Sequence, residues 1–408
     1  MMMSLLTRLV FVTLLMTALI SHPADTTAAN DIASLAEGNT AFALDLYARL
    51  KSADDNLFFS PYSISTCLAM TYAGARGDTA AQMVKTLHFD TNQNQLAASF
   101  GELQRQLNTE QEKKRIELNI ANGLWGQKDH PFLPAYLDLA KQSYGANLEQ
   151  VDFRTHADTA QTEINDWVSQ RTKGKITDLI QPGVLGPATR LVLVNAIYFK
   201  GRWDKEFDKH NTTNAPFSVT PDQKLEVPLM KLTADYKYAE VEGLQLLELP
   251  YAGDDLSMVV LLPRDVDGLK DVENLLNEQS LNHWLSQARE QKVAVLLPKF
   301  KLTAQFSLAK PLGEMGMTDA FSPRADFSGM DGERDLFISA VVHKAFVDVN
   351  EEGIEAAAAT GVVMRMNAVM RPRPTPIFRA DHPFIFLIRD SHSGSILFLG
   401  RLVDPTRS

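Results

Sequence analysis

Four polar side chains lie at the edge of, or inside, runs of apolar residues, and their types could serve either chemistry or structure. Ser60 and Ser63 open one apolar run, and Asn195 and His343 interrupt two others. Hydroxyl, amide and imidazole groups occur in catalytic sites, but buried polar groups of these kinds are usually hydrogen-bonded to one another. From the residues alone we favour polar core groups with satisfied hydrogen bonds over a catalytic set.

The chain carries no common catalytic, phosphate-binding or metal-binding motif. It lacks a glycine-rich phosphate loop with Lys, a His-Glu-x-x-His pair and a Gly-x-Ser-x-Gly elbow. Cys67 is the only cysteine, so no intrachain disulfide is possible, and its apolar neighbours favour a core position over a nucleophile. We therefore expect no enzyme activity, no cofactor and no metal site.

Residues 351–382 have a composition unlike that of a folded core. The first half is rich in Ala and Gly, and the second half is rich in Pro and Arg. Connections of this length are usually functional or disordered. Read as a strand, the first half has one uncharged face, made of Ile354, Ala356, Ala358, Thr360, Val362 and Met364. Such a segment could enter a sheet with one face buried, although a flexible Ala-rich linker is the alternative.

Apolar periodicity predicts the elements that would position these residues. Helices are expected over residues 32–50, from Ser60-Pro61 through Met70, from a capped start at Asp78-Thr79 with Gln82, and over 157–172. Strands are expected at 191–199, 256–262, 293–297, 338–349, 384–388 and 396–400, the last two as a hairpin. With no repeat and no linker, residues 30–408 should form one domain.

The N-terminal residues predict export. Arg8 precedes an apolar run from Leu9 to Ile20, which is typical of a signal peptide and too short for a membrane span. Small residues at Thr27-Ala28-Ala29 place the cleavage near residue 30, so residues 1–29 would be removed. We therefore expect a secreted protein, extracellular or periplasmic.

The overall charge limits the partners. Hydrophobic residues make up 45% of the chain and charged residues 22%, which is ordinary for a globular protein with a large core. The net charge of −10 argues against nucleic acid or an anionic membrane as the main partner. Lys113-Lys114-Arg115 is too short a basic cluster to predict polysaccharide binding.

Several stretches resemble, in order, the motifs of the serpin family, and together they cover almost the whole chain after residue 30. The hinge-like stretch is Val349–Thr360, which resembles that of inhibitory serpins. The others are Asn56–Ile64, Ile164–Val168, Lys173–Ile176, Leu193–Trp203, Leu296–Phe300, His382–Ile388 and Phe398–Arg401.

The resemblance implies the α+β serpin fold, with three β-sheets, about eight or nine helices and an exposed reactive-centre loop at about residues 351–382. It implies a gate, or shutter, under the main sheet formed by Ser60, Ser63, Asn195 and His343, and a breach residue, Trp203, where the loop first enters. It implies a hinge made of Glu351, Glu352, Gly353, Ile354, Glu355, Ala356, Ala357, Ala358, Ala359 and Thr360. Ile354 stands where such serpins usually carry Thr or Ser, and its uncharged side chain should still permit insertion.

The resemblance also implies a mechanism. A serine protease, or a cysteine protease, attacks the loop and is held as a covalent one-to-one acyl-enzyme complex when the cut loop enters the main sheet. The family spacing from Gly353 places the cleaved bond between Asn367 and Ala368. Arg365, which would suit a trypsin-like enzyme, and Met366, which would suit a chymotrypsin-, elastase- or subtilisin-like one, are alternative residues at the cut. We expect a monomer.

Two other functions remain open at this point. The chain could be a non-inhibitory serpin-fold protein that acts as a carrier, a chaperone or a storage protein. It could also be a secreted hydrolase, although it lacks any nucleophile motif.

Overall fold

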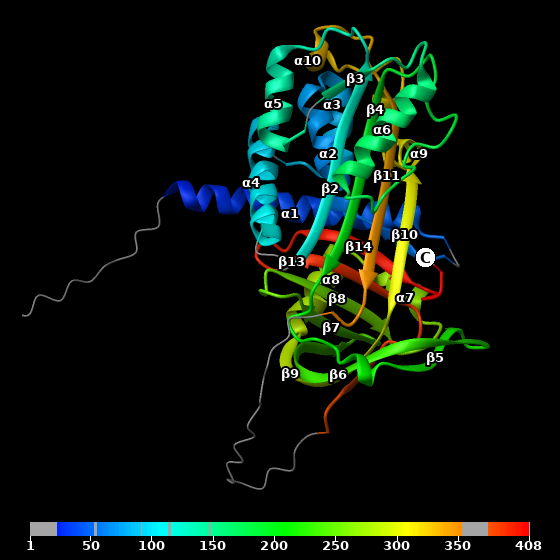
Figure 1. The fold of residues 1–408 in the computed structure, drawn as a ribbon. Coiled ribbons are helices and arrows are strands. Elements are labelled where there is room, and N and C mark those ends of the chain that lie inside the picture. Colours follow the sequence, from blue (N-terminus) through cyan, green and yellow to red (C-terminus); the bar gives the residue numbers. More distant parts are fainter. Residues whose placement is uncertain are drawn as a thin grey trace, which may run out of the picture.

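The structure is a computed structural model of the 408-residue chain, in which residues 23–52, 55–90, 92–112, 116–146, 148–352 and 374–407 are described. Within these residues the strands form a five-stranded and a nine-stranded sheet, surrounded by ten α-helices. Figure 1 shows the five-stranded sheet along the length of the molecule and the nine-stranded sheet across its lower half.

The bounds of the elements are as follows. The strands are β1 (Leu57–Phe59), β2 (Ile116–Gln127), β3 (Leu148–Val151), β4 (Leu191–Gly201), β5 (Thr213–Thr220), β6 (Gln223–Val241), β7 (Leu244–Pro250), β8 (Leu256–Pro263), β9 (Arg289–Pro298), β10 (Phe300–Ser307), β11 (Ile338–Val349), β12 (Ile377–Arg379), β13 (Phe384–Asp390) and β14 (Ile396–Leu402). The α-helices are α1 (Pro23–Leu50), α2 (Pro61–Gly74), α3 (Gly77–Leu87), α4 (Gln93–Glu112), α5 (Pro134–Tyr144), α6 (Ala157–Arg171), α7 (Leu269–Leu275), α8 (Glu278–Gln287), α9 (Ala309–Glu314) and α10 (Ser328–Asp331). Two short 3₁₀ helices are η1 (Lys209–Asn211) and η2 (Asp319–Phe321).

The five-stranded sheet has the order β10-β11-β4-β2-β3. β10 is antiparallel to β11, and β2 is antiparallel to β4, but β11 and β4 run parallel to each other. The centre of this sheet is therefore a parallel pair between antiparallel neighbours. We call the boundary between β4 and β11 the seam.

β4 is apolar along most of its length because both of its faces are buried. Leu191, Leu193 and Ile197 belong to the larger core, which also contains most of α2. The alternate residues Val192 and Val194 belong to a smaller core that also contains residues of α6. This alternation is the period-two pattern of a strand covered on both sides.

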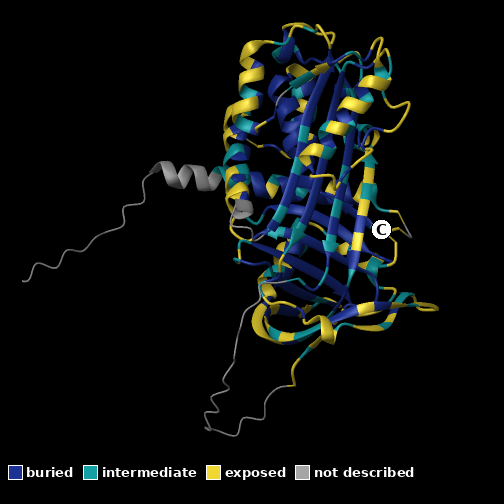
Figure 2. Cartoon of the chain, viewed as in Figure 1, coloured by how far each residue is buried: buried dark blue, intermediate teal, exposed yellow. Residues whose placement is uncertain are grey.

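The helices divide between the two faces of this sheet. α2 packs behind β4, β2 and β14, and α6 lies across the opposite face, in front of the sheet in Figure 1. In Figure 2, β2, β4 and β11 are buried over most of their length, whereas the edge strand β10 and the helices α5 and α6 each turn an exposed side outward. The middle of the sheet is thus covered on both faces.

α2 begins as its sequence predicts. Ser60 caps the helix, with its hydroxyl accepting from the Ser63 N–H at 3.1 Å, and Pro61 takes the first helical position, where no N–H is needed. α2 is buried along its whole length.

The nine-stranded sheet has the order β1-β14-β13-β8-β7-β6-β9-β12, with β5 also paired to β6. β6 is 19 residues long and pairs with β5, β7 and β9. It therefore joins two parts of the sheet. One part is the run β1-β14-β13-β8-β7, and the other contains β5, β9 and β12. Those two parts and the five-stranded sheet account for the three sheets expected of the fold.

Most of the predicted elements are confirmed. β11 has the predicted bounds, β13 and β14 form the predicted hairpin, and α6 ends one residue before its predicted limit. The predicted cap of α3 is wrong. Arg76 occupies the cap position without a side-chain bond, and the Thr79 hydroxyl instead accepts from the Asp326 N–H at 2.9 Å.

None of the described helices is long and apolar enough to cross a lipid bilayer.

Candidate functional site

The seam joins β4 and β11 through a register that pairs Leu191–Phe199 with Ile338–Val347. At its middle, Asn195 and His343 are directly opposite each other, and on the next strand Asn122 is opposite Asn195. The register thus aligns three polar residues in one row across β2, β4 and β11. We call this row, together with Ser60 and Ser63, the shutter cluster.

The row is tied together by side-chain hydrogen bonds. The Asn195 amide oxygen meets Nδ1 of His343 across the seam, and its Nδ2 group donates to Asn122 and, at 2.6 Å, to the Ser63 hydroxyl. The Ser63 hydroxyl donates to Oδ1 of Asn122 at 2.9 Å. The hydrogen bond between Asn195 and His343 must break if the two strands part.

α2 holds the other side of the cluster. The backbone N–H of Ser60 donates to Nε2 of His343 at 3.1 Å, and the Ser60 hydroxyl donates to the Leu397 carbonyl of β14 at 2.6 Å. Because Nε2 accepts, the ring proton of a neutral His343 lies on Nδ1, from which it donates to Asn195. The seam is therefore bonded both to the helix behind it and to the second sheet.

His343 is fully buried, and this burial lowers its pKa from 6.5 to about 3. The ring of Phe306 stacks on it with 6.4 Å between the ring centres. A neutral, hydrogen-bonded imidazole in this setting is neither exposed to a substrate nor titrated near neutral pH. The structure brings Ser60, Ser63, Asn195 and His343 together in one buried hydrogen-bonded cluster, and their role as a gate stays a prediction.

The lower end of the seam carries the start of the predicted hinge. Trp203 follows β4, and its backbone N–H donates to the Glu352 carbonyl at 3.0 Å, while its indole N–H donates to the Asn350 carbonyl at 2.8 Å. The backbone N–H of Phe207 donates to the Glu351 carbonyl at 3.2 Å. The chain leaving β11 is thus anchored to the chain leaving β4.

Glu351 is a buried anchor of this end. Its carboxylate pairs with Lys299 at 2.8 Å and accepts from the Thr212 hydroxyl at 2.9 Å. Burial acts to raise its pKa, but the hydrogen bonds and the charge of Lys299 outweigh burial, and the pKa lies below its usual value. Glu352 is more exposed and pairs with Lys200 of β4 at 2.6 Å.

Trp203 is also held by packing. Its ring stacks on Tyr251 with 4.6 Å between ring centres and 9° between the planes. Tyr251 in turn lies edge-on to Phe199, the last β4 residue paired across the seam. Trp203 therefore connects residues 350–352 to the end of the seam.

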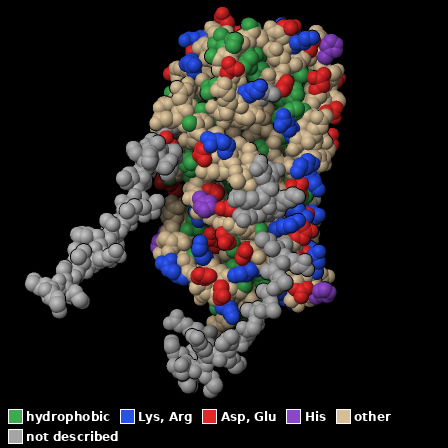
Figure 3. All heavy atoms as spheres, turned by 60° about the vertical axis from the view of Figure 1, so that its left-hand side comes forward, with side chains coloured by type: hydrophobic (Ala, Val, Ile, Leu, Met, Phe, Trp, Pro, Cys, Tyr) green, Lys and Arg blue, Asp and Glu red, His purple; other side chains and the backbone are tan. Residues whose placement is uncertain are grey.

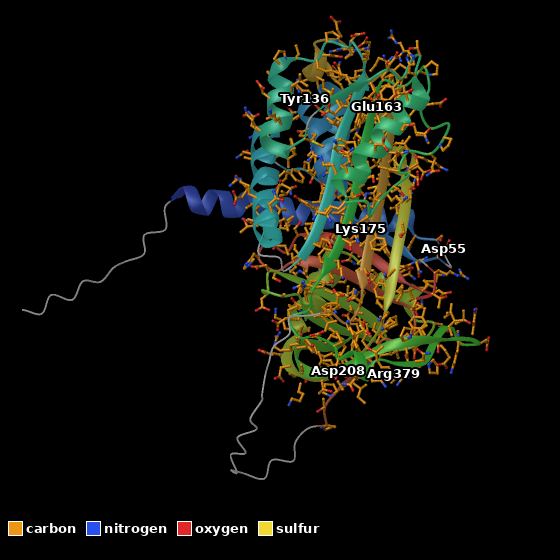
Figure 4. All side chains as sticks on the ribbon, in the orientation of Figure 1. Asp55, Tyr136, Glu163, Lys175, Asp208 and Arg379 are labelled. Atoms are coloured by element: carbon orange, nitrogen blue, oxygen red, sulfur yellow. The ribbon has the colours of Figure 1, made fainter. Side chains whose placement is uncertain are left out.

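The opposite face of the seam is covered by the chain that follows α6. Lys175 lies over the Tyr198 ring at 5.3 Å, and Tyr198 stacks on Phe346 across the seam at 5.1 Å. Lys344 of β11 donates to the Thr177 carbonyl at 2.8 Å. Figure 4 labels Lys175 near the middle of the sheet, so this segment covers the seam there.

Several predicted residues lie outside the described part of the chain. They are the rest of the hinge (Gly353, Ile354, Glu355, Ala356, Ala357, Ala358, Ala359 and Thr360), the candidates for the cut bond (Arg365, Met366, Asn367 and Ala368) and the basic cluster Lys113, Lys114 and Arg115. Residues 374–382, at the far end of this segment, are described: β12 runs parallel to β9, and Phe378 is fully buried.

Other residues match their expected roles. Cys67 is buried in the core, and burial raises the pKa of its thiol to about 12, which suits a core residue and not a nucleophile. Asn122 is a further member of the hydrogen-bonded cluster that the sequence did not reveal. On the face shown in Figure 3, basic and acidic side chains lie interspersed.

Comparisons with known proteins agree with this geometry. Residues 37–405 match the family described as Serpin (serine protease inhibitor). The human leukocyte elastase inhibitor is 44% identical over 382 residues, covering 91% of this chain and 99% of that protein, and serpin B6 of Macaca fascicularis is 42% identical over 379 residues, with the same coverage. The structure of uncleaved ovalbumin superimposes with a TM-score of 0.83 at 34% identity, covering 91% of this chain and all of the other.

The expected secretion is contradicted by these relatives. Leukocyte elastase inhibitors and serpin B6 are intracellular serpins that lack a signal peptide. The prediction of an extracellular or periplasmic location is corrected accordingly. The cleavage near residue 30 stays a prediction, and that position falls inside α1, which runs from Pro23 to Leu50.

The match over residues 37–405, the identity of 42–44% to full-length relatives and the shared fold all point the same way. In the described part of the chain, Asn195 and His343 lie opposite each other across the seam, and Trp203 lies at its lower end. The chain belongs to the serpin family of protease inhibitors.

Proposed function

We propose that this protein is an inhibitory serpin, which traps a serine protease as a covalent complex after its cut loop inserts between β4 and β11. The observation that carries the proposal is the parallel seam, bonded through Asn195 and His343 and anchored at its lower end to Glu351 and Glu352. A cysteine protease is a further target class that the same loop chemistry would admit.

The direction of the strands favours insertion at this seam over any other place in the sheet. β11 leads directly into the hinge, so a chain that reverses near Gly353 would run antiparallel to β11. Because β4 is parallel to β11, the same strand would be antiparallel to β4 as well. One inserted strand would therefore turn the parallel pair into two antiparallel pairs, which are slightly more stable per residue.

The free energy available is sufficient to drive such a change. A central strand adds on the order of ten backbone hydrogen bonds, each contributing about 1 kcal/mol net, so the gain is about 10 kcal/mol before apolar burial. The costs are opening the shutter cluster and moving the cover that follows α6. Loop insertion in serpins is itself an established example of strand addition.

The covalent step uses the protease's own chemistry. The protease serine Oγ attacks the carbonyl carbon at the cut bond, and an ester to the loop forms as the bond to the next nitrogen breaks. The new amine takes the proton, which the protease histidine has accepted from the serine. Inserting about fourteen residues would carry the ester roughly 45 Å along the sheet, away from the anchored hinge. Hydrolysis of the ester by water then stalls because the protease site is distorted.

The target class is proposed from the loop and the relatives together. We infer a cut at Asn367–Ala368, with Met366 and Arg365 as the alternatives. The relatives named leukocyte elastase inhibitor are 42–44% identical to this chain, and the Met and Val residues just before Asn367 suit elastase- or chymotrypsin-like enzymes. A cut two residues early would shorten the inserted strand by about 7 Å, which favours release over trapping.

The proposal is tested by incubating the protein separately with elastase, chymotrypsin, trypsin and subtilisin. We expect a complex that survives boiling in detergent with at least one of them. Mass spectrometry of the released C-terminal peptide should show a start at Ala368, or at Asn367 or Met366 for the alternative bonds.

A different outcome would favour a non-inhibitory serpin that acts as a carrier, chaperone or storage protein. Cleavage in the loop by every protease tried, cysteine proteases included, without any stable complex, would overturn the inhibitory proposal. Turnover of ester or peptide substrates by the protein itself is not expected, because the described residues around the seam hold no accessible nucleophile.

A further inference from the structure

A mixed cluster of histidine and aspartate lies at the end of the molecule far from the hinge. His130 follows β2, Asp331 is the last residue of α10, and Asp335 lies on the short connection into β11. Each offers one ligand atom, and the three atoms lie within 4.8 Å of one another. α10 and α5 are at the upper end of Figure 1, and Figure 4 marks Tyr136 of α5 in the same region.

The burial of Asp331 sets this cluster apart from ordinary surface carboxylates. Its side chain is fully buried, and Nε2 of His130, whose side chain is 15% exposed, lies 2.8 Å from its Oδ2. A buried carboxylate needs a positive partner or a metal ion. Among the described ion pairs, no lysine or arginine joins Asp331, and the nearby Arg334 pairs with Asp326 at 3.0 Å. His130 supplies a charge only when it is protonated.

We propose that His130, Asp331 and Asp335 form a binding site for a divalent transition-metal ion of the zinc class. One imidazole nitrogen and two carboxylate oxygens are ligands that Zn²⁺ accepts, and water would complete the coordination. Ligand distances of about 2.0–2.2 Å require donor atoms to stand roughly 3.4 Å apart in a tetrahedral site. Nε2 of His130 and Oδ2 of Asp331, now 2.8 Å apart, would move apart to reach that value, and the ligand atom of Asp335 lies within 4.8 Å of both.

The neighbouring contacts hold two of the ligands in place through their other atoms, and a bound ion would replace the hydrogen bond that joins Nε2 of His130 to Oδ2 of Asp331. Oδ1 of Asp331 accepts from the Glu333 N–H at 2.8 Å, which fixes the carboxylate and leaves Oδ2 toward His130. The His130 ring packs edge-on against Phe132, and its carbonyl accepts from Gln150 at 2.7 Å. Such outer contacts orient ligands and strengthen metal binding.

The site would join two distant parts of the chain. His130 and Asp331 are separated by 201 positions, and their segments are otherwise linked by a hydrogen bond from the Leu133 N–H to the Met330 carbonyl at 2.7 Å. A bound ion would tie the end of β2 to the connection that enters β11. Since the folded chain alone assembles these ligands, ion binding should stabilise the folded state. The sequence predicted no metal site because no local motif contains all three ligands.

The test is calorimetric titration of the tag-free, metal-stripped full chain with ZnCl₂, and with MgCl₂ for comparison. We expect one equivalent of Zn²⁺ to bind at micromolar concentration, together with a rise in the melting temperature. Asp335→Asn should weaken binding by about tenfold or more because one of three protein ligands is lost, and His130→Gln should weaken it further.

A matched control variant distinguishes Zn²⁺ binding at this site from Zn²⁺ binding at surface histidines. His156 pairs with Asp152 at 3.0 Å on the surface, and the described residues place no third ligand with this pair, so His156→Gln should bind Zn²⁺ as the unaltered protein does. Melting in the absence of metal verifies that each variant is folded, and Asp335, being exposed, is the safest substitution. The proposal is overturned if no Zn²⁺ binds below about 100 µM. It is equally overturned if both site variants bind as tightly as the control, or if Mg²⁺ binds as tightly as Zn²⁺.

Discussion

At the scale of single residues, His343 shows how a polar group can hold two strands together without taking part in catalysis. It is buried and neutral, accepts from Ser60 and donates to Asn195 across the seam. His343 stabilises the folded state only while its imidazole ring is uncharged. That dependence makes the seam sensitive to acid.

The first prediction concerns pH. The pKa of His343 is about 3 in the folded state and near 6.5 when unfolded, so between these values the unfolded state binds more protons. Stability should therefore be complete above pH 6.5 and should fall as the pH is lowered, by up to about 1.4 kcal/mol per pH unit. Urea unfolding between pH 4.5 and 7.5 measures this slope above the range in which most carboxylates titrate.

Two variants test the assignment of that slope. His343→Gln should flatten the pH dependence, whereas His210→Gln should keep it because the His210 side chain is 96% exposed. An unchanged slope in His343→Gln would show that another group is responsible.

The second prediction concerns the hydrogen bond that Trp203 makes to the hinge. Trp203→Phe keeps an aromatic ring against Tyr251 but loses the hydrogen bond to the Asn350 carbonyl. This loss should lower the free energy of unfolding by about 1 kcal/mol, in addition to the effect of the smaller ring. Trp125 is an equally buried control whose indole N–H has no hydrogen-bond partner in the structure. Trp125→Phe should therefore cost less. If urea unfolding shows the same loss of stability in Trp203→Phe and Trp125→Phe, the anchoring role of Trp203 is contradicted.

The sequence revealed part of the shutter cluster and missed part of it. Asn195 and His343 stand out because they interrupt apolar strands. Asn122 does not, since its neighbours in β2 include other polar and small residues. It joins the cluster through register, because β2 pairs with β4 so that Asn122 meets Asn195. Strand register is a tertiary property that local pattern cannot supply.

At the scale of elements, the seam is defined by strand direction more than by any single contact. β4 and β11 are parallel neighbours, each with an antiparallel partner on its other side. Alternate residues of β4 face the core behind the sheet and the smaller core under α6. A strand inserted here would likewise place alternate residues in two different environments.

The third prediction uses this alternation. Read as a strand, the sequence puts Ala356 on the uncharged face, which we expect to be buried after insertion, and Ala357 on the opposite face. Ala356→Glu should convert the protein from an inhibitor into a substrate, because burying an unpaired carboxylate is costly. Ala357→Glu, with the same side chain one position along, should retain most of the complex formed on a gel. Equal loss in both variants would argue against this register.

Elements with strong local patterns were predictable, and those fixed by tertiary contacts were not. β11 and the β13–β14 hairpin follow from apolar runs and a turn-like segment. The start of α3 was misjudged because Thr79 bonds to Asp326, 247 positions away, instead of capping its own helix. β6 was not predicted because its long sequence mixes polar and apolar residues, and its bounds are set by pairing with three other strands.

At the scale of the whole molecule, the structure is that of a serpin with its seam closed. The five-stranded sheet pairs β4 with β11 directly, so no strand lies between them. The proposed function requires that this arrangement be less stable than one with the loop inserted. The difference should appear whenever the loop is cut, whether or not a protease is trapped.

The most direct test compares thermal unfolding before and after a single cut between residues 360 and 370. A gain of about 10 kcal/mol on insertion should raise the melting temperature by roughly 20 °C or more, as judged from about 2 °C per kcal/mol for larger domains. The cut chain should also keep its C-terminal fragment on gel filtration, because β12, β13 and β14 belong to the second sheet. A melting temperature that is unchanged after complete cleavage would contradict loop insertion and, with it, the proposed mechanism.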